Sequence, residues 1–342
     1  MELNNPKNIS SLNVFIDGLA RSGKSSMCQT IVSLKNSEHI DMATNLEYII
    51  TGLVSKKISP DFAKTYLKTY FNQTGYNKLI GRGVNFRPTD FTGIANFRDP
   101  KVYYDRLKIF SYGKKKYHYK KTHIKVNSLT DPVLKSLNTK YFFFPFQTHY
   151  LLSYFKEFKN LDLNYKIIEL LRNPIDVVFS TISRGSYNFH SEKDIRLLTL
   201  SITHKKRNVP WFVHDYVEEY IKSTNHERAT LMVVNNLEKM IKNRNLIKPL
   251  IGKKIFILPF EKFITNTKKE MQNIAKFLKT KTTKHTDIFI KNANCPRKLN
   301  SDKTNEKLKF LSKKIKNKYL LKRLIKLENE YKKDLYGFNI KK

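Results

Sequence analysis

The residues Gly18–Ser25 (GLARSGKS) have the spacing G-x-x-x-x-G-K-[ST], which is typical of loops that bind phosphate groups. In such a loop the backbone N–H groups point at phosphate oxygens, and the helix that follows adds the positive end of its dipole. The apolar run Leu12–Asp17 predicts a buried strand before the loop, and a helix is expected from Gly23 to about Leu34. A strand, a glycine-rich turn and a helix in this order indicate a phosphate-binding α/β unit.

Two classes of ligand could occupy this loop. In a kinase or another enzyme that uses ATP and magnesium, Lys24 would hold the β- and γ-phosphates and Ser25 would hold the metal. Such an enzyme also needs a carboxylate at a strand end, and neither Asp17 nor Glu169 is a convincing metal ligand. In a transfer of a sulfuryl group, Arg21 would instead neutralise charge on the bridging oxygen, and no metal is required.

A second candidate site lies in the middle of the chain. Arg172 follows the apolar run Tyr165–Leu171, which predicts another buried strand, and Pro174 suits the first turn of a helix that would run to about Arg184. Ser180 lies two turns into that helix. An arginine fork and a hydroxyl together suit a terminal phosphate monoester. Such a monoester distinguishes 3′-phosphoadenosine 5′-phosphosulfate (PAPS) from ATP.

Both motifs resemble those of one enzyme family. The segment Leu171–Ser180 (LRNPIDVVFS) resembles the 3′-phosphate motif of the PAPS-dependent sulfotransferases. Arg21–Gly23, followed by small hydroxyl residues, is similar to the 5′-phosphosulfate loop of the tyrosyl-protein and carbohydrate members of that family. The chain departs from the family at Lys24, where serine or threonine is usual, and this lysine keeps the kinase alternative open.

The resemblance extends into the C-terminal part of the chain. Phe260–Phe263 and then Met271–Leu278 resemble the family's acidic-residue loop and short helix, and Cys295–Lys298 loosely resembles the basic segment that closes over the 3′-phosphate. About half of the chain is covered in this way.

The resemblance implies a donor site for PAPS as co-substrate, with no metal. The residues that would hold PAPS are Arg21, Ser22, Gly23, Lys24, Ser25, Ser26, Arg172, Ser180, Arg297 and Lys298. Arg21 and Lys24 would also act in catalysis by neutralising charge on the leaving group. The acceptor would be a hydroxyl or an amine, and a saccharide, anionic or neutral, is our first expectation.

Two residues are candidates for the base that removes the acceptor's proton. His149 follows Thr148 and lies 23 positions before Arg172, which resembles a Thr-His pair in the cytosolic sulfotransferases. Glu47 lies soon after the phosphate-loop helix, where the tyrosyl-protein and carbohydrate members carry an acidic base. A base in hydrogen-bond reach accelerates such a step by roughly 10²–10⁴-fold. The sequence leaves the choice open.

The composition limits the kinds of partner. The chain of 342 residues has 65 Lys+Arg and 29 Asp+Glu, for a net charge of +36, which favours anionic ligands. An AT-rich coding genome also enriches lysine, and the charges form no recognised nucleic-acid-binding module, so a nucleic-acid partner is not expected. The two cysteines, Cys28 and Cys295, form no disulfide framework and favour a cytoplasmic location. No apolar run is long enough for a membrane span.

The remaining patterns define the expected fold. Strands that alternate with helices predict one three-layer α/β/α domain over residues 1–342, P-loop-like, with a mostly parallel central sheet. Its ligand would lie at the carboxyl ends of the strands. We expect an acceptor-site insertion around residues 72–140, which would be irregular from Asn72 to Thr130 and would carry an exposed basic run at Lys114–Lys121. We also expect a basic helical C-terminus over residues 300–342. The other expected elements are strands at Tyr141–Pro145 and Lys254–Pro259 and helices at Asn45–Phe71 (broken near Pro60), Asn266–Leu278 and Asn305–Leu335.

Overall fold

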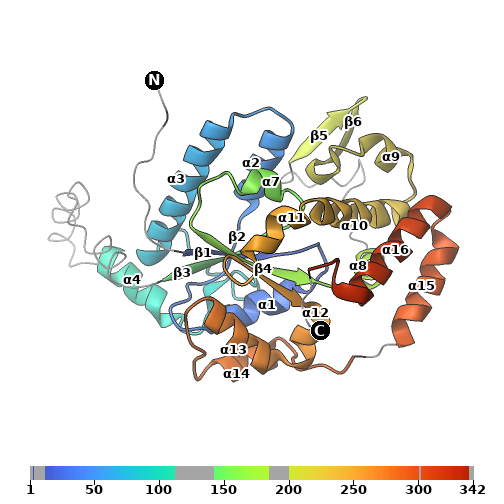
Figure 1. Cartoon of the computed structure of the whole chain (residues 1–342). Coiled ribbons are helices and arrows are strands. Elements are labelled where there is room, and N and C mark those ends of the chain that lie inside the picture. Colours follow the sequence, from blue (N-terminus) through green and yellow to red (C-terminus); the bar gives the residue numbers. More distant parts are fainter. Residues whose placement is uncertain (1–2, 4–11, 112–141, 185–199, 300–301, 339–342) are drawn as a thin grey trace.

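The computed structural model describes residues 3, 12–111, 142–184, 200–299 and 302–338, and a parallel sheet lies at its centre (Figure 1). The sheet has five strands in the order β2-β3-β1-β4-β7. Each neighbouring pair is parallel. The strands are β1 (Leu12–Asp17), β2 (Asp41–Met42), β3 (Phe143–Gln147), β4 (Tyr165–Leu171) and β7 (Ile255–Pro259). All five carboxyl ends therefore meet at one edge of the sheet.

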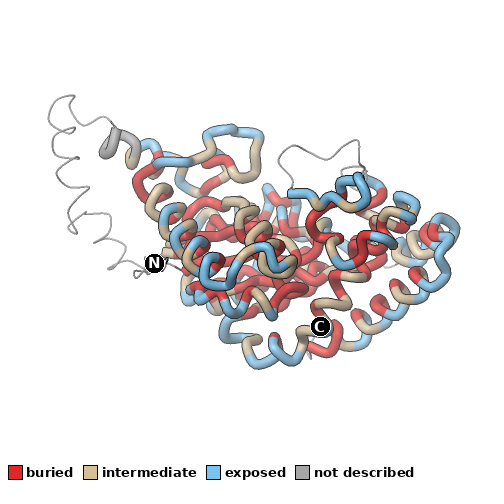
Figure 2. Tube along the Cα trace, turned by 90° about the horizontal axis from the view of Figure 1, so that it is seen from above, coloured by how far each residue is buried: buried red, intermediate tan, exposed pale blue. Residues whose placement is uncertain are grey.

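Helices cover both faces of the sheet. All six residues of β1 are buried, and successive side chains enter different cores: Phe15 packs in one core cluster, and Val14 and Ile16 pack in the other. Figure 2 shows buried residues gathered at the centre of the molecule, with exposed residues on the outer faces of the helices. The predicted three-layer α/β/α fold with a parallel sheet is confirmed.

The core cluster that contains Phe15 takes in the larger set of helices. They are α2 (Thr44–Val54), α3 (Pro60–Leu79), α7 (Phe155–Phe158), α8 (Pro174–Ser183), η3 (Trp211–Val213), α9 (Val217–Lys222), α10 (Asn225–Lys242), α11 (Arg244–Ile247), η4 (Lys248–Leu250), α15 (Asp302–Lys314) and α16 (Lys318–Asp334). The other cluster takes in α1 (Lys24–Ile31), η1 (Ile94–Asn96), α4 (Lys101–Ser111), α12 (Phe260–Thr265), α13 (Thr267–Phe277) and α14 (Thr286–Asn292). A separate antiparallel hairpin joins β5 (Ser201–His204) to β6 (Arg207–Pro210).

The expectation that the chain is irregular from Asn72 onward was wrong for the described residues. The stretch from Asn72 is not irregular at its start, because α3 continues to Leu79 and buries Gly75 and Leu79 on the same side as Phe71. Helix α4 adds further regular structure to the predicted insertion, whose remaining residues, with the run Lys114–Lys121, lie outside the described part of the chain.

The basic C-terminus is helical, as expected, and it forms two helices. The side chain of Asn317 accepts a hydrogen bond from the N–H of Leu320 and starts α16, which separates it from α15. The long helix α10 was missed, although Thr224 and Glu227 form a capping box at its start that the sequence does show. Within the described residues, no helix has the length and apolar character needed to cross a bilayer.

Candidate active site

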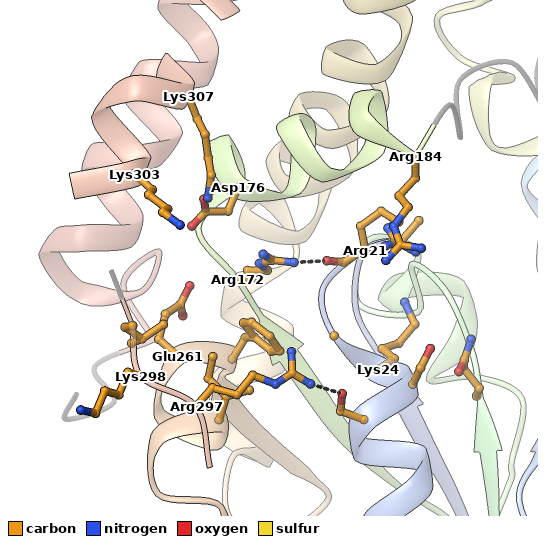
Figure 3. A pocket seen from close by; sticks show the side chains of 18 of the residues that line it. Arg21, Lys24, Arg172, Asp176, Arg184, Glu261, Arg297, Lys298, Lys303 and Lys307 are labelled. Atoms are coloured by element: carbon orange, nitrogen blue, oxygen red, sulfur yellow. Dashed lines mark hydrogen bonds and ion pairs between the residues drawn. The ribbon is translucent and has the colours of Figure 1, made fainter. Parts of the chain in front are cut away.

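A cavity of about 710 Å³ opens at the carboxyl edge of the sheet, beside the first turns of α1 and α8 (Figure 3). Its size suits a nucleotide-sized ligand. The structure brings most of the predicted site residues to its wall. These are Arg21, Gly23, Lys24, Ser25, Ser26, His149, Arg172, Arg297 and Lys298. The predicted residues Ser22, Ser180 and Glu47 do not line the cavity, but Ser180 bonds to Arg21 and Glu47 contacts His149, both of which do.

The phosphate loop takes a conformation that depends on glycine. Gly23 has a φ of 100°, and a Cβ atom there would lie 2.2 Å from the ring of Phe260. Helix α1 begins at the next residue, Lys24, and within the described residues no side chain caps its N-terminus. The positive end of the helix dipole therefore faces the cavity, as in other anion-binding loops.

The side chain of Lys24 bonds to the backbone of its own loop. Its Nζ donates hydrogen bonds of 2.7 Å to the carbonyl oxygens of Gly18 and Leu19, and only 4% of the residue is exposed. Burial lowers the pKa of Lys24 to about 8, although the nearby carboxylates of Asp17 and Glu169 favour its charged form. Burial likewise raises the pKa of both carboxyl groups. In this structure the lysine thus supports the loop from beneath.

The two predicted anion-binding motifs meet in this cavity, although 151 positions separate them. Arg172 Nη1 donates to the carbonyl oxygen of Arg21 at 2.8 Å, and Arg21 Nε donates to Ser180 Oγ at 3.2 Å. Arg184, at the C-terminal end of α8, points toward Arg21 (Figure 3). Burial, followed by the charges of Arg184 and Arg172, lowers the pKa of Arg21. Three guanidinium groups so close together favour a multiply charged anion.

The C-terminal basic segment reaches the same loop. Arg297 Nη2 donates to Ser26 Oγ at 3.2 Å and to the carbonyl oxygen of Ala293 at 2.8 Å. Ser22 Oγ is buried and has no hydrogen-bond partner among the described residues. Lys298 lines the cavity beside Arg297. The sequence prediction that 297–298 close over the donor site therefore agrees with their position, and their ligand contacts stay a prediction.

The two candidate bases form a pair. Glu47 Oε1 lies 3.0 Å from His149 Nδ1, and the side chains are 7% and 23% exposed respectively. With Glu47 accepting from Nδ1–H, the other ring nitrogen of His149 carries the free lone pair. Thr148 fixes the segment, since its hydroxyl donates to Asp17 Oδ1 at 3.0 Å and its N–H donates to the carbonyl of Ile16. The sequence presented the two residues as alternatives, whereas the structure joins them.

Sequence reasoning missed five charged residues of the cavity wall: Asp176, Arg184, Glu261, Lys303 and Lys307. A signal for two of them was present, because Asp176 and Arg184 flank Ser180 at intervals of four residues on the predicted helix. No local signal in the sequence indicated that α15 would lie at this site, because residue spacing does not predict contacts between helices that are distant in the chain.

A family model described as a sulfotransferase domain matches residues 13–325 of this chain. The chain belongs to the sulfotransferase family. It is an enzyme that transfers sulfuryl groups, and members of this PAPS-dependent family use PAPS as their donor. No curated protein matches the sequence significantly.

Solved sulfotransferases are similar to this chain at low sequence identity. The sulfotransferase domain of the Synechococcus PCC 7002 olefin synthase is 12% identical with a TM-score of 0.44, covering 98% of both chains. A sulfotransferase domain from the curacin biosynthetic pathway is 8% identical (TM-score 0.41), covering 90% of this chain and 99% of its own. A sulfotransferase from Alicyclobacillus acidocaldarius is 13% identical (TM-score 0.36), covering 94% and 96%.

The placement of the acidic residues does not favour the kinase alternative. Asp17 and Glu169 are partners in the register of β1 and β4 and are buried beneath the phosphate loop, away from the cavity wall. The two carboxylates that do line the cavity, Asp176 and Glu261, are engaged with other protein groups. Among the described residues, this sulfotransferase therefore offers no carboxylate that suits magnesium beside the lysine of its phosphate loop.

Proposed function

We propose that this sulfotransferase moves the sulfuryl group of PAPS to a hydroxyl (or amine) acceptor in the cavity lined by Arg21 and Arg172. The observation that carries this proposal is the direct contact between the phosphate loop and the Arg172 motif. A ligand that satisfied both would carry anionic groups at two separate positions, as PAPS does at its 5′-phosphosulfate and 3′-phosphate. Arg172, Ser180, Arg297 and Lys298 would hold the 3′-phosphate.

The proposed reaction is an in-line displacement at sulfur. The acceptor oxygen forms a bond to sulfur while the bond from sulfur to the bridging phosphate oxygen breaks, and 3′-phosphoadenosine 5′-phosphate leaves. Arg21 and the backbone N–H groups of Ser22–Ser26 would stabilise the charge that develops on the leaving group, and the ammonium group of Lys24 would add its charge from beneath the loop. The acceptor's proton would pass to His149 Nε2. Glu47 would orient the imidazole ring and stabilise the imidazolium ion.

We further propose that the acceptor is a saccharide, and an anionic one. Arg184 supports this assignment, because it lies at the end of the cavity that also holds Arg21, away from α15 (Figure 3). Gln147 and His149 add polar groups to the wall, and a wall rich in hydrogen-bonding groups suits a polyhydroxyl ligand. The cytoplasmic location expected from the cysteines stays a prediction.

Thermal unfolding tests the donor assignment. At 100 times its dissociation constant, 3′-phosphoadenosine 5′-phosphate should raise the free energy of unfolding by about 2.7 kcal/mol and Tm by a few degrees. ATP with magnesium should stabilise the protein much less. The Arg172→Ala variant should lose the stabilisation, because one charge-assisted contact to phosphate is worth roughly tenfold or more in affinity.

The matched control is Arg82→Ala, which removes an exposed arginine that does not line the cavity. It should keep the full stabilisation by 3′-phosphoadenosine 5′-phosphate. Stabilisation by ATP and magnesium alone would contradict the proposal and would favour the kinase alternative.

A further inference from the structure

Helix α15 forms one wall of the cavity, although the sequence showed it only as part of a basic C-terminus. It packs against α8, and its first turns bring Lys303 and Lys307 to the lining (Figure 3). The two lysines are one helical turn apart and therefore lie on the same side of α15. The outward side of α15 carries further lysines, such as Lys309 and Lys313, which are exposed and do not line the cavity.

Lys307 has a partner in the wall. Its ammonium group forms an ion pair with Asp176, in the first turn of α8, and the side chains are 23% and 15% exposed. A free carboxylate here would repel an incoming phosphate, because Asp176 lies only four positions from Arg172 and lines the same cavity. The ion pair removes most of that repulsion and attaches α15 to α8.

Lys303 is in a different situation. It has no hydrogen bond or ion pair with any described residue, yet its side chain points into the cavity beside Asp176 (Figure 3). It lies on the side of Arg172 that faces away from Arg21 and Lys24, so it is far from the phosphate loop. A lysine is a compact charge on a flexible stem, which suits contact with a phosphate oxygen.

We propose that Lys303 is a further binding residue for the 3′-phosphate of the donor, and that α15 completes the donor site with Lys307 neutralising Asp176. This inference rests on the proposed function of the cavity. The 3′-phosphate carries up to two negative charges, and the positive charges already assigned to it come from Arg172 and from the segment with Arg297 and Lys298. Lys303 adds a further positive charge from α15, and this charge would strengthen the preference of the cavity for a nucleotide with a 3′-phosphate over one without it.

Calorimetric titration with two nucleotides tests the inference. The probes are 3′-phosphoadenosine 5′-phosphate and AMP, which differ only by the 3′-phosphate. The native protein should prefer the bisphosphate strongly. The Lys303→Met variant should bind the bisphosphate roughly tenfold more weakly and bind AMP as the native protein does, since a charged hydrogen bond is lost only with the first ligand. Lys309→Met, on the exposed side of the same helix, should match the native protein with both.

The outcomes separate this inference from the proposed function. A native protein that binds both nucleotides equally would overturn the donor assignment itself. A native preference for the bisphosphate that persists in Lys303→Met would overturn only the role of Lys303. Equal weakening of both nucleotides would also overturn that role, because it would show general attraction by charge. Because Lys303 is exposed, the variant should fold, and an unchanged Tm without ligand checks this.

Discussion

The pair formed by Glu47 and His149 joins residues that are 102 positions apart. Glu47 comes from α2, directly after β2, and His149 follows β3. Because β2 and β3 are neighbouring parallel strands, their carboxyl ends bring Glu47 beside His149, which lines the cavity. Each residue resembles the base of a different branch of the sulfotransferases, and here the geometry supports one histidine base with a carboxylate that positions it.

The variant Glu47→Gln should lower the rate of the chemical step without changing the affinity for the donor. Glutamine can still accept from His149 Nδ1–H, but it lacks the charge that stabilises the imidazolium ion, so kcat should fall on the order of 10²-fold. Affinity for 3′-phosphoadenosine 5′-phosphate should not change, because Glu47 does not line the cavity. Release of the bisphosphate from PAPS with water as acceptor measures the rate.

The variant Glu47→Asp is the matched comparison, because it keeps the charge on a shorter side chain. It should retain more activity than Glu47→Gln. A loss of donor affinity equal to the loss of kcat would argue for a structural role of Glu47.

At the scale of elements, α12 and α16 brace the end of β4. Glu261 Oε1 accepts the N–H of Asn173 at 3.2 Å, and the Tyr331 hydroxyl contacts Glu261 and lies 3.4 Å from the carbonyl oxygen of Leu171. Burial, followed by the charge of Glu261, raises the pKa of Tyr331, so its hydroxyl stays protonated and donates. The backbone groups on both sides of Arg172 are thus held by helices remote in sequence.

The variant Tyr331→Phe should therefore weaken donor binding indirectly, because Tyr331 would not itself contact the donor. Loss of the hydroxyl removes one hydrogen bond to Glu261, worth about 1–3 kcal/mol when a buried charged partner is involved. Affinity for 3′-phosphoadenosine 5′-phosphate should fall severalfold, with a smaller effect on AMP, which lacks the group that Arg172 would hold. Titration calorimetry of both nucleotides measures this.

Tyr336→Phe provides a matched control. Tyr336 packs against Tyr331 with ring centroids 5.7 Å apart, and its buried hydroxyl has no partner among the described residues. This variant should leave both affinities unchanged. Equal effects of the two substitutions would show that ring packing, and not the hydrogen bond, controls the site.

At the scale of the whole molecule, the C-terminal helices share the core of the sheet. Leu324 of α16 is fully buried in the cluster that also contains Phe15 of β1 and Ile167 of β4. We expect the chain to fold as one domain, as the sequence predicted. The helices that bear Lys303 and Tyr331 would then be fixed by the same core that positions the strand ends.

Leu324→Ala should destabilise the whole protein. Loss of a fully buried leucine side chain lowers the free energy of unfolding by about 2–5 kcal/mol, and urea unfolding should show one transition at lower urea. Lys322→Ala, at an exposed position of the same helix, should change little. A separate early transition for the C-terminal helices would contradict folding as one domain.

The sequence by itself determined the parts of this protein that depend on near neighbours. The bounds of β1 and β4 agree with the predicted strands residue for residue, because a strand buried on both faces needs a mostly apolar segment. The phosphate loop was predicted because a turn and a helix start require particular residues at fixed spacing, and the Arg172 motif was predicted from its resemblance to a known family.

Only the tertiary structure decided how these parts combine. The Glu47–His149 pair, the contact of Arg172 with Arg21 and the approach of Lys303 to the cavity all join residues from different strands or helices. Their closeness depends on the order of the strands in the sheet and on the packing of α15 against α8. The free energy of that packing comes from buried apolar surface shared by the whole chain, so no local pattern specifies it.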